Sequence, residues 1–297
     1  MPDSDAIAQF LTSGLTTGCG YALVALGLVV MANVSGVVNL AQGEYVATGG
    51  LLLASLSAAH VPITVSLIVI AAAGTLLGVL QERLTVQPIL RAPHFVQITV
   101  TLGVAVVIRG GAFLIWGKDP IGVPGFSGDE VLLLAGAIFP VQTLWVWFGT
   151  SLMLLVAFGV LMFTQIGRAV RACSINRTAA RLMGINPQRM SMMVFAASGA
   201  ASTISGALLA PLALAAWDSG LTLGVKGLIA AVFAGFRSPL AAVVAGLAIG
   251  ILESFVSGLG SSASKDVILY GLLLAGLLVI GGVFARGRDR LHAGISA

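Results

Sequence analysis

The feature that most constrains this chain is a series of apolar runs, each close to 20 residues long. About 20 consecutive apolar residues are needed for a helix to cross the hydrocarbon core of a membrane. Only 9% of the 297 residues are charged and 58% are hydrophobic, whereas a soluble domain carries about a quarter charged residues. The sequence therefore predicts an all-α polytopic membrane protein with about eight full transmembrane helices. The expected spans are 11–32, 40–59, 62–80, 95–116, 141–164, 191–216, 238–258 and 267–285.

Two further apolar segments are too short to cross the membrane as upright helices. Residues 224–236 form a run of 13 residues with glycines near both ends, and 131–139 is shorter still. Non-helical or broken segments at membrane depth are tolerated only where protein buries them or where they line a cavity. We therefore expect 224–236 to be a short or broken crossing, and 131–139 to be a re-entrant or interfacial piece.

The longest polar interruption is the segment 167–190, which lies between two predicted spans. It carries five arginines and no acidic residue, and its alanines favour a helix that ends at Gly184 and Asn186. One interpretation is a short cytoplasmic helix whose small residues fit a socket in a soluble partner. The other is a basic loop that only fixes the topology, because arginine-rich loops stay on the cytoplasmic side.

The distribution of basic residues predicts the orientation of the chain. If the segment 167–190 is cytoplasmic and 224–236 crosses the membrane, the N-terminus lies outside and the C-terminus inside. Eleven of the fifteen basic residues then lie inside, which agrees with the usual excess of positive charge on that side. These are Arg83, Arg91, Arg168, Arg171, Arg177, Arg181, Arg189, Arg237, Arg286, Arg288 and Arg290.

Polar residues within the apolar runs are candidates for a functional site. Asn39, Gln42 and Glu44 follow the first predicted span, where lipid would penalise them. The alternative is a hydrated polar turn at the inner surface of the membrane.

Arg109 and Glu253 each lie in a predicted span that starts on the cytoplasmic side. At a rise of 1.5 Å per residue, both are about 20 Å from the start of their spans. We expect them to face the protein interior and to interact, with Glu44 deeper at the inner side. The alternative is that each side chain reaches the outer interface separately.

The sequence offers no candidate catalytic, metal or nucleic-acid site. It lacks the G-x-x-x-x-G-K-[ST] motif of a nucleotide-binding loop, and its three histidines are far apart. The net charge of +4 comes from loops between spans and does not indicate nucleic-acid binding. We therefore expect no cofactor on this chain and no enzymatic activity.

Three groups of motifs resemble the permease subunits of the branched-chain amino-acid ABC transporters. Residues 18–27 followed by 39–44 are similar to the N-terminal signature of that family. Residues 167–172 with 179–186 are similar to its ATPase-coupling loop, and 226–235 with 246–253 are similar to its C-terminal half. The motifs occur in the right order over almost the whole chain, so 1–297 is read as a single transmembrane permease domain. Gln42 departs from the family pattern, which commonly has histidine there.

The resemblance implies an ATP-driven importer of branched-chain or related small amino acids in the bacterial inner membrane. Its implied partners are a second related permease, two ATPase subunits that bind ATP, a periplasmic binding protein and membrane lipid. Relatives with similar motifs carry urea, short-chain amides or aromatic acids, so the substrate stays open. The candidate coupling residues are Arg168, Arg171, Ala179, Ala180, Gly184 and Asn186, and the candidate path residues are Asn39, Gln42, Glu44, Arg109, Lys226 and Glu253.

A competing function is an ion-coupled secondary transporter that uses Glu44, Arg109 and Glu253 as ion or proton sites. Such a transporter does not need a small-residue cytoplasmic helix for an external motor. The segment 167–190 therefore distinguishes the two hypotheses.

Overall fold

The computed structural model describes residues 4–128, 130–134, 136–259, 267–268, 270–271 and 274–275. Within them, six helical segments are long and apolar enough to span a membrane. They comprise α1 (Ser4–Ser35), α3 (Ile63–Gln81) continued by η1 (Glu82–Val86) and α4 (Gln87–Ile89), α5 (His94–Trp116), α6 (Gln142–Phe163), α9 (Pro187–Leu209) and α11 (Pro239–Leu259). Most of the predicted span 267–285 and the basic tail beyond it lie outside the described residues.

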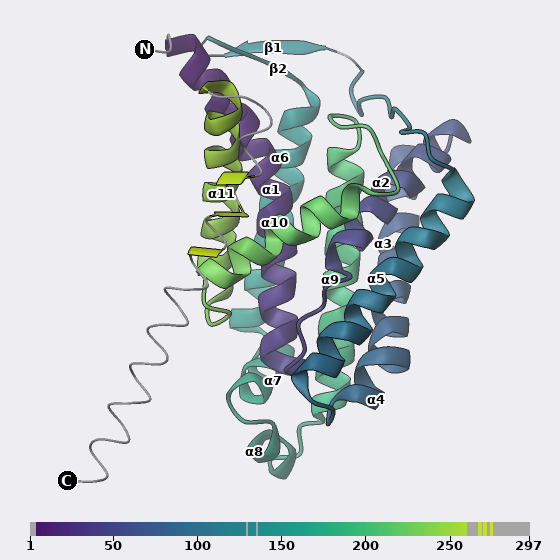
Figure 1. Cartoon of the computed structure of the whole chain (residues 1–297), viewed down its shortest axis with the longest axis vertical. Coiled ribbons are helices and arrows are strands. Elements are labelled where there is room, and N and C mark those ends of the chain that lie inside the picture. Colours follow the sequence, from purple (N-terminus) through teal and green to yellow (C-terminus); the bar gives the residue numbers. More distant parts are fainter. Residues whose placement is uncertain are drawn as a thin grey trace, which may run out of the picture.

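Helix α1 is at the centre of the bundle, where it packs against α9, α11 and the shorter helix α10 (Ser219–Phe233) (Figure 1). Its middle turns are fully buried, and Tyr21, Val24 and Leu28 form a core with Ile229 and Ala230 of α10. Helix α9 packs in turn against α3 and α2 (Gln42–Ala58). The core therefore joins α1, near the start of the chain, to α10 and α11, more than 180 residues later.

Helix α2 begins inside the bundle rather than at its end. After α1 ends at Ser35, Gly36 adopts a left-handed conformation (φ 75°), and the chain turns back before helix α2 starts (Figure 1). Asn39, just before α2, contacts Gln81. The helical segment that contains Gln81 continues to Ile89, about 12 Å further along the bundle, so α2 starts well before the end of that segment. The prediction of a full span over 40–59 is not confirmed: α2 has 17 residues, or about 25 Å against a hydrocarbon core of roughly 30 Å, and it is not among the six segments above.

Helix α10 is the second short element, and it runs obliquely across the bundle (Figure 1). It begins at Ser219, five residues before the predicted segment 224–236, and ends at Phe233. Helices α2 and α10 touch where Gly43 meets Gly220 and Gly224; a side chain at Gly43 would overlap their backbone. The expectation of a short or broken element holds for α10 and also applies to α2.

The basic segment folds into two helices, α7 (Gln165–Ile175) and α8 (Arg177–Leu182), at the end of the bundle opposite the N-terminus (Figure 1). The prediction of one continuous helix is wrong, because Asn176 interrupts it. The Asn176 side chain caps α8 by accepting hydrogen bonds from the backbone N–H groups of Thr178 and Ala179, both at 3.0 Å. The predicted stop at Gly184 is confirmed, since its φ is +81°.

The segment expected to be re-entrant or interfacial is a β-hairpin. Strands β1 (Val131–Leu134) and β2 (Ala137–Pro140) pair antiparallel, with Leu132 opposite Phe139. The hairpin lies beside the start of α1, where the Ile138 N–H donates to Gln9 Oε1 at 2.9 Å (Figure 1). A hairpin at this end of the bundle does not fit the re-entrant alternative, and among the described residues β1 and β2 are the two strands of an otherwise helical fold.

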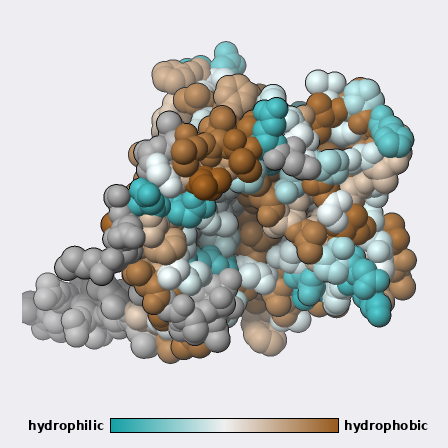
Figure 2. All heavy atoms as spheres, turned by 90° about the horizontal axis from the view of Figure 1, so that it is seen from above, coloured by the Kyte–Doolittle hydropathy of each residue, from teal (hydrophilic) through white to brown (hydrophobic). Residues whose placement is uncertain are grey.

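Large apolar side chains remain exposed along the outer helices. Seen from the end that carries the hairpin, apolar residues appear at many points of the outline (Figure 2). Val107 and Leu114 of α5 and Phe148 and Leu155 of α6 are among the most exposed. An apolar perimeter of this extent is expected where lipid or another membrane subunit surrounds the helices.

Candidate functional site

The segment before α2 carries a buried network of amide groups. Asn39 Oδ1 accepts hydrogen bonds from the backbone N–H of Ala41 at 3.0 Å and from Gln81 Nε2 at 2.7 Å. In return, Asn39 Nδ2 donates to Gln81 Oε1 at 3.1 Å. The Tyr45 hydroxyl donates to the same Gln81 oxygen. Buried amides need such partners because an unsatisfied polar group at membrane depth costs several kcal/mol. The network fixes the irregular backbone that leads into α2.

Gln42 attaches the first turn of α2 to α9. Its Nε2 donates to Ser198 Oγ at 2.7 Å and to Ser202 Oγ at 2.6 Å. A side chain at Gly27 of α1 would overlap Ser198 and Gln42, so glycine leaves the space that this contact occupies. The hydrated-turn interpretation of 39–44 is therefore wrong, because Asn39, Gln42 and Glu44 are all buried.

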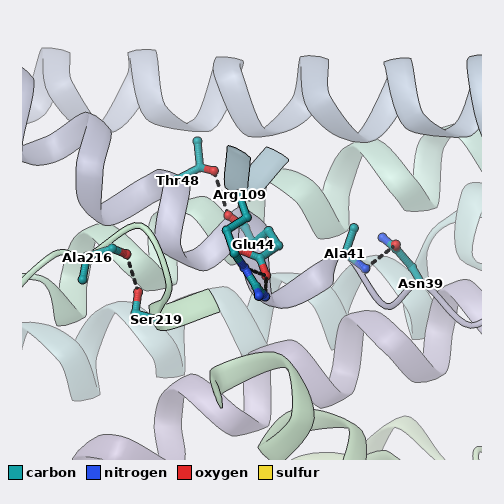
Figure 3. Close-up of polar contacts among 7 residues, drawn as sticks. All are labelled: Asn39, Ala41, Glu44, Thr48, Arg109, Ala216 and Ser219. Atoms are coloured by element: carbon teal, nitrogen blue, oxygen red, sulfur yellow. Dashed lines mark hydrogen bonds and ion pairs between the residues drawn. The ribbon is translucent and has the colours of Figure 1, made fainter. Parts of the chain in front are cut away.

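Glu44 forms an ion pair with Arg109 of α5 (Figure 3). Both Nε, at 3.2 Å, and Nη2 of the guanidinium donate to Glu44 Oε1. The Glu44 side chain is 3% exposed and that of Arg109 is 22% exposed. A buried carboxylate inside a membrane bundle requires such a partner, and the charged donors strengthen both hydrogen bonds to the one oxygen.

The carboxylate of Glu44 also lies against α10. A Cβ added at Gly220 would overlap the Glu44 side chain, so the absence of a side chain there makes room for the ion pair. The two short helices and α5 therefore meet at one charged position inside the bundle.

A second buried ion pair joins α10 to α11. Lys226 Nζ contacts Glu253 Oε1, and the Tyr21 hydroxyl of α1 donates to Glu253 Oε2 at 2.7 Å. The Lys226 ammonium also lies 5.6 Å from the centre of the Tyr21 ring, within cation–π range. One charged cluster thus connects α1 to the consecutive helices α10 and α11, which lie far along the chain from it.

These pairs correct the prediction that Arg109 interacts with Glu253. Arg109 pairs with Glu44, and Glu253 pairs with Lys226. Separate snorkelling is equally wrong for Glu253, which is buried. Glu44 lies at the level of Arg109, so its predicted position deeper at the inner side is also wrong.

The six candidate path residues therefore form two ion pairs and one pair of linked amides, in which Asn39 Nδ2 donates to Gln42 Oε1 at 3.5 Å. Sequence reasoning missed the partners that complete them, namely Gln81, Tyr45, Ser198, Ser202 and Tyr21. A glutamine and several serines within apolar helices are a weak signal, because small polar residues are common in packed membrane helices. Within the described part of the chain, no three His, Cys, Asp or Glu residues gather to hold a metal ion.

Comparison with known proteins identifies the family. A family model described as the branched-chain amino acid transport system permease component matches residues 10–279. The chain belongs to this family. The match spans both short helices and both buried ion pairs, and it confirms the resemblance seen in the sequence motifs.

The permease is also similar to individual transport proteins. It is 26% identical to the high-affinity branched-chain amino acid transport system permease protein LivH of Salmonella typhimurium, over 92% of this chain and 93% of that protein. It is 27% identical to the LivH protein of Escherichia coli over the same shares. A ribose import permease protein of Haemophilus influenzae is 26% identical over 85% of this chain and 79% of its own length. No solved structure matches the chain.

Proposed function

We propose that the permease is the membrane subunit of an ATP-driven importer for branched-chain or related small amino acids. The family match over residues 10–279 carries this proposal, and the named substrates of the LivH relatives support it. A second related permease completes the path, two ATPase subunits bind ATP, and a periplasmic binding protein delivers the substrate. The assembly resides in the bacterial inner membrane.

Helices α7 and α8 are the proposed docking site for the ATPase. Three apolar side chains on this basic projection face outward: Ile175, Leu182 and Met183 are 87%, 83% and 82% exposed. A large apolar side chain that is exposed at the tip of a charged element is typical of a contact with a soluble partner. Transport would be coupled to ATP hydrolysis through a helix that the partner moves.

The predicted coupling residues divide into two groups. Arg168, Ala179 and Gly184 are exposed, and Arg171 is half-buried. Ala180 is buried against the permease itself, so its side chain is not accessible to a partner. Asn186 is exposed, but its side chain caps α9 by accepting the N–H groups of Gln188 and Arg189. We therefore assign contact to the first group and positioning of the loop to Ala180 and Asn186.

The proposed orientation places α7 and α8 in the cytoplasm and the N-terminus outside. The basic residues of α7 and α8 support this orientation, because positive charge is enriched on the cytoplasmic side. The opposite positions of α8 and the N-terminus along the bundle agree with it (Figure 1).

The ion-coupled alternative has less support from the geometry. Glu44 and Glu253 each contact a cation of the same chain, so binding of a proton or metal ion would have to break an ion pair. Breaking a buried pair costs about 3–5 kcal/mol.

Uptake by the reconstituted assembly tests the proposal. The permease is placed in liposomes with its proposed ATPase and permease partners, and the binding protein and labelled leucine are added outside. We expect uptake that requires internal ATP and persists with a protonophore. The control is the same assembly with the nucleotide-binding-loop lysine of each ATPase replaced. Leucine uptake driven by an ion gradient without ATP would refute the proposed function.

A further inference from the structure

An apolar cavity lies about one helical turn from the Glu44–Arg109 ion pair along α5. Its volume is about 200 Å³, and it is lined by α1, α5, α10 and the segment around the start of α2. It is partly open, since Leu102 and Leu221 of its lining are 47% and 49% exposed. Apart from two amides, every lining residue is Leu, Val, Ala or Gly. The lining residues are Leu28, Asn39, Leu40, Gln42, Leu102 and Ala105, together with four residues of α10.

Neither Glu44 nor Arg109 lines this cavity, but both residues adjoin its lining along the chain or across a helix contact. Ala105 lines the cavity and precedes Arg109 by one helical turn on α5. Leu221 also lines it and directly follows Gly220, whose backbone lies against the Glu44 carboxylate. An occupant of the cavity would therefore have apolar surroundings, with a cation and an anion about one helical turn beyond the lining.

We propose that this cavity and the Glu44–Arg109 pair form a transient binding site for a zwitterionic α-amino acid with an aliphatic side chain. The inference rests on the proposed function and adds the position and the chemistry of the substrate site. The substrate carboxylate binds the guanidinium of Arg109, and the substrate ammonium binds the carboxylate of Glu44. The side chain occupies the apolar cavity.

Charge balance favours a zwitterion over other small solutes. The ion pair has no net charge, so inserting a zwitterion leaves every charge with an opposite partner. A substrate with only a carboxylate or only an ammonium group would leave one buried charge without a partner, and such a charge is costly at membrane depth. An uncharged solute such as urea or a sugar would have to separate the pair without replacing either charge.

The geometry of Arg109 allows the exchange. Its Nε and Nη2 both donate to one oxygen of Glu44, and a guanidinium has five N–H donors arranged to bind a second carboxylate. The side chain is 22% exposed, so part of it is accessible to an incoming anion. The substrate therefore need not displace Glu44 before it makes its first contact.

The size of the cavity suits a branched aliphatic side chain. An apolar protein cavity of about 150 Å³ holds a benzene molecule, and the isobutyl group of leucine has two fewer carbon atoms. The amides of Asn39 and Gln42 already have partners in Gln81, Ser198 and Ser202. Because these amides are already hydrogen-bonded, the occupant needs no polar side chain to satisfy them.

Binding of labelled leucine to the permease–ATPase assembly, without the binding protein, tests this site directly. We expect saturable binding that valine and isoleucine compete for. Neither 4-methylpentanoate, which lacks the amine, nor 3-methylbutylamine, which lacks the carboxylate, should compete at equal concentration. If an assembly that imports leucine shows no saturable binding, or if both analogues compete as well as valine, the site is refuted while the proposed function stands.

The double variant Glu44→Gln/Arg109→Gln separates binding from folding. Two amides retain a hydrogen bond across the same gap and leave no buried charge, so we expect the variant to insert and to assemble. Leucine binding should fall by at least about tenfold, since both charged contacts are lost. Gly103→Ala is the control, because an added Cβ on that side of α5 meets nothing. Wild-type leucine binding in the double variant refutes the proposal.

A substitution within the cavity gives a second measurement, which does not depend on the ion pair. Ala105→Leu fills part of the space for the substrate side chain. We expect leucine binding to fall more than alanine binding, so that the leucine-to-alanine ratio drops by roughly tenfold. An unchanged ratio in an assembled variant excludes the cavity as the side-chain site.

Discussion

The guanidinium of Arg177 in α8 donates a hydrogen bond of 2.7 Å from Nη1 to the backbone carbonyl of Ser35, the last residue of α1. The residues after Ser35 are the buried segment that carries Asn39 and leads into Gln42 and Glu44. One contact therefore connects the proposed ATPase-docking helices to the chain segment that holds the candidate site. Through a connection of this kind, movement of a docked helix can be transmitted to a distant site.

We predict that Arg177→Ala weakens coupling without preventing assembly. The carbonyl of Ser35 would lose its donor, and movement of α8 would no longer be transmitted to the segment before α2. ATP hydrolysis should continue, while the amount of leucine imported per ATP hydrolysed should fall about fivefold or more. A fivefold change corresponds to the lower end of the usual coupling free energies between two sites. Arg177→Lys, which keeps one positively charged donor, should recover part of the ratio. An unchanged ratio in Arg177→Ala contradicts the connection.

Close packing of α3 on α9 gives a prediction about stability. Gly74 and Gly199 face one another, and a Cβ at either position would overlap the backbone of the other helix. Gly199→Val should therefore force the helices apart and cost at least about 1–3 kcal/mol. A lower melting temperature of the purified permease, measured by fluorescence-detected size-exclusion chromatography, would show this. Gly110→Val on α5 is the matched control, because a Cβ there meets nothing within 4 Å; equal losses would contradict the packing argument.

The sequence predicted most of the long helices because apolar length alone decides whether a helix can cross. It could not place the start of α2, since the run 40–59 is as apolar as a full span. Only the tertiary contact of Asn39 with Gln81 reveals that α2 begins inside the bundle. The split between α7 and α8 did have a signal, because Asn176 precedes a helix-forming stretch as an N-cap residue does.

The candidate site was predicted as a set of residues but not as a set of pairs. Counting residues from the start of each span places Arg109 and Glu253 at the same depth. Depth does not determine which helices are neighbours, and α10 inserts Lys226 beside Glu253. The oblique course of α10 brings Gly220 to Glu44 at one position and Lys226 to Glu253 at another.

Cys173 gives a native reporter of the position of α7. Its side chain is buried with Val170 and Phe195 in a core below the basic face. Burial raises the pKa of the Cys173 thiol, and the nearby Arg177 opposes this only in part. A raised pKa leaves less thiolate at a given pH, so labelling by a maleimide should be slow near pH 7 and should accelerate as the pH rises.

The matched control for this labelling is an exposed cysteine one position further along. Ser174 is exposed, so Cys173→Ser/Ser174→Cys should label at least about tenfold faster than the native Cys173 at the same pH. Mass spectrometry of the labelled peptide measures both rates. Equal rates would contradict the docked position of α7.

The last prediction concerns the Lys226–Glu253 pair. Lys226→Met removes the lysine charge from the buried Glu253 carboxylate, and losing one partner of a buried pair costs about 3–5 kcal/mol. Lys226→Met/Glu253→Met replaces both charges with apolar side chains of similar length, and such replacements are often neutral or stabilising. The melting temperature of the double variant should therefore lie above that of Lys226→Met.

Tyr21→Phe provides the graded comparison for this pair. It removes the 2.7 Å hydrogen bond from the Tyr21 hydroxyl to Glu253, while the aromatic ring beside Lys226 remains. A hydrogen bond to a charged group contributes about 1.5–3 kcal/mol, so Tyr21→Phe should destabilise the permease less than Lys226→Met. If the double variant melts below Lys226→Met, the cost does not come from the remaining buried charge. The cluster would then stabilise the junction of α1, α10 and α11 through attraction that apolar packing cannot replace.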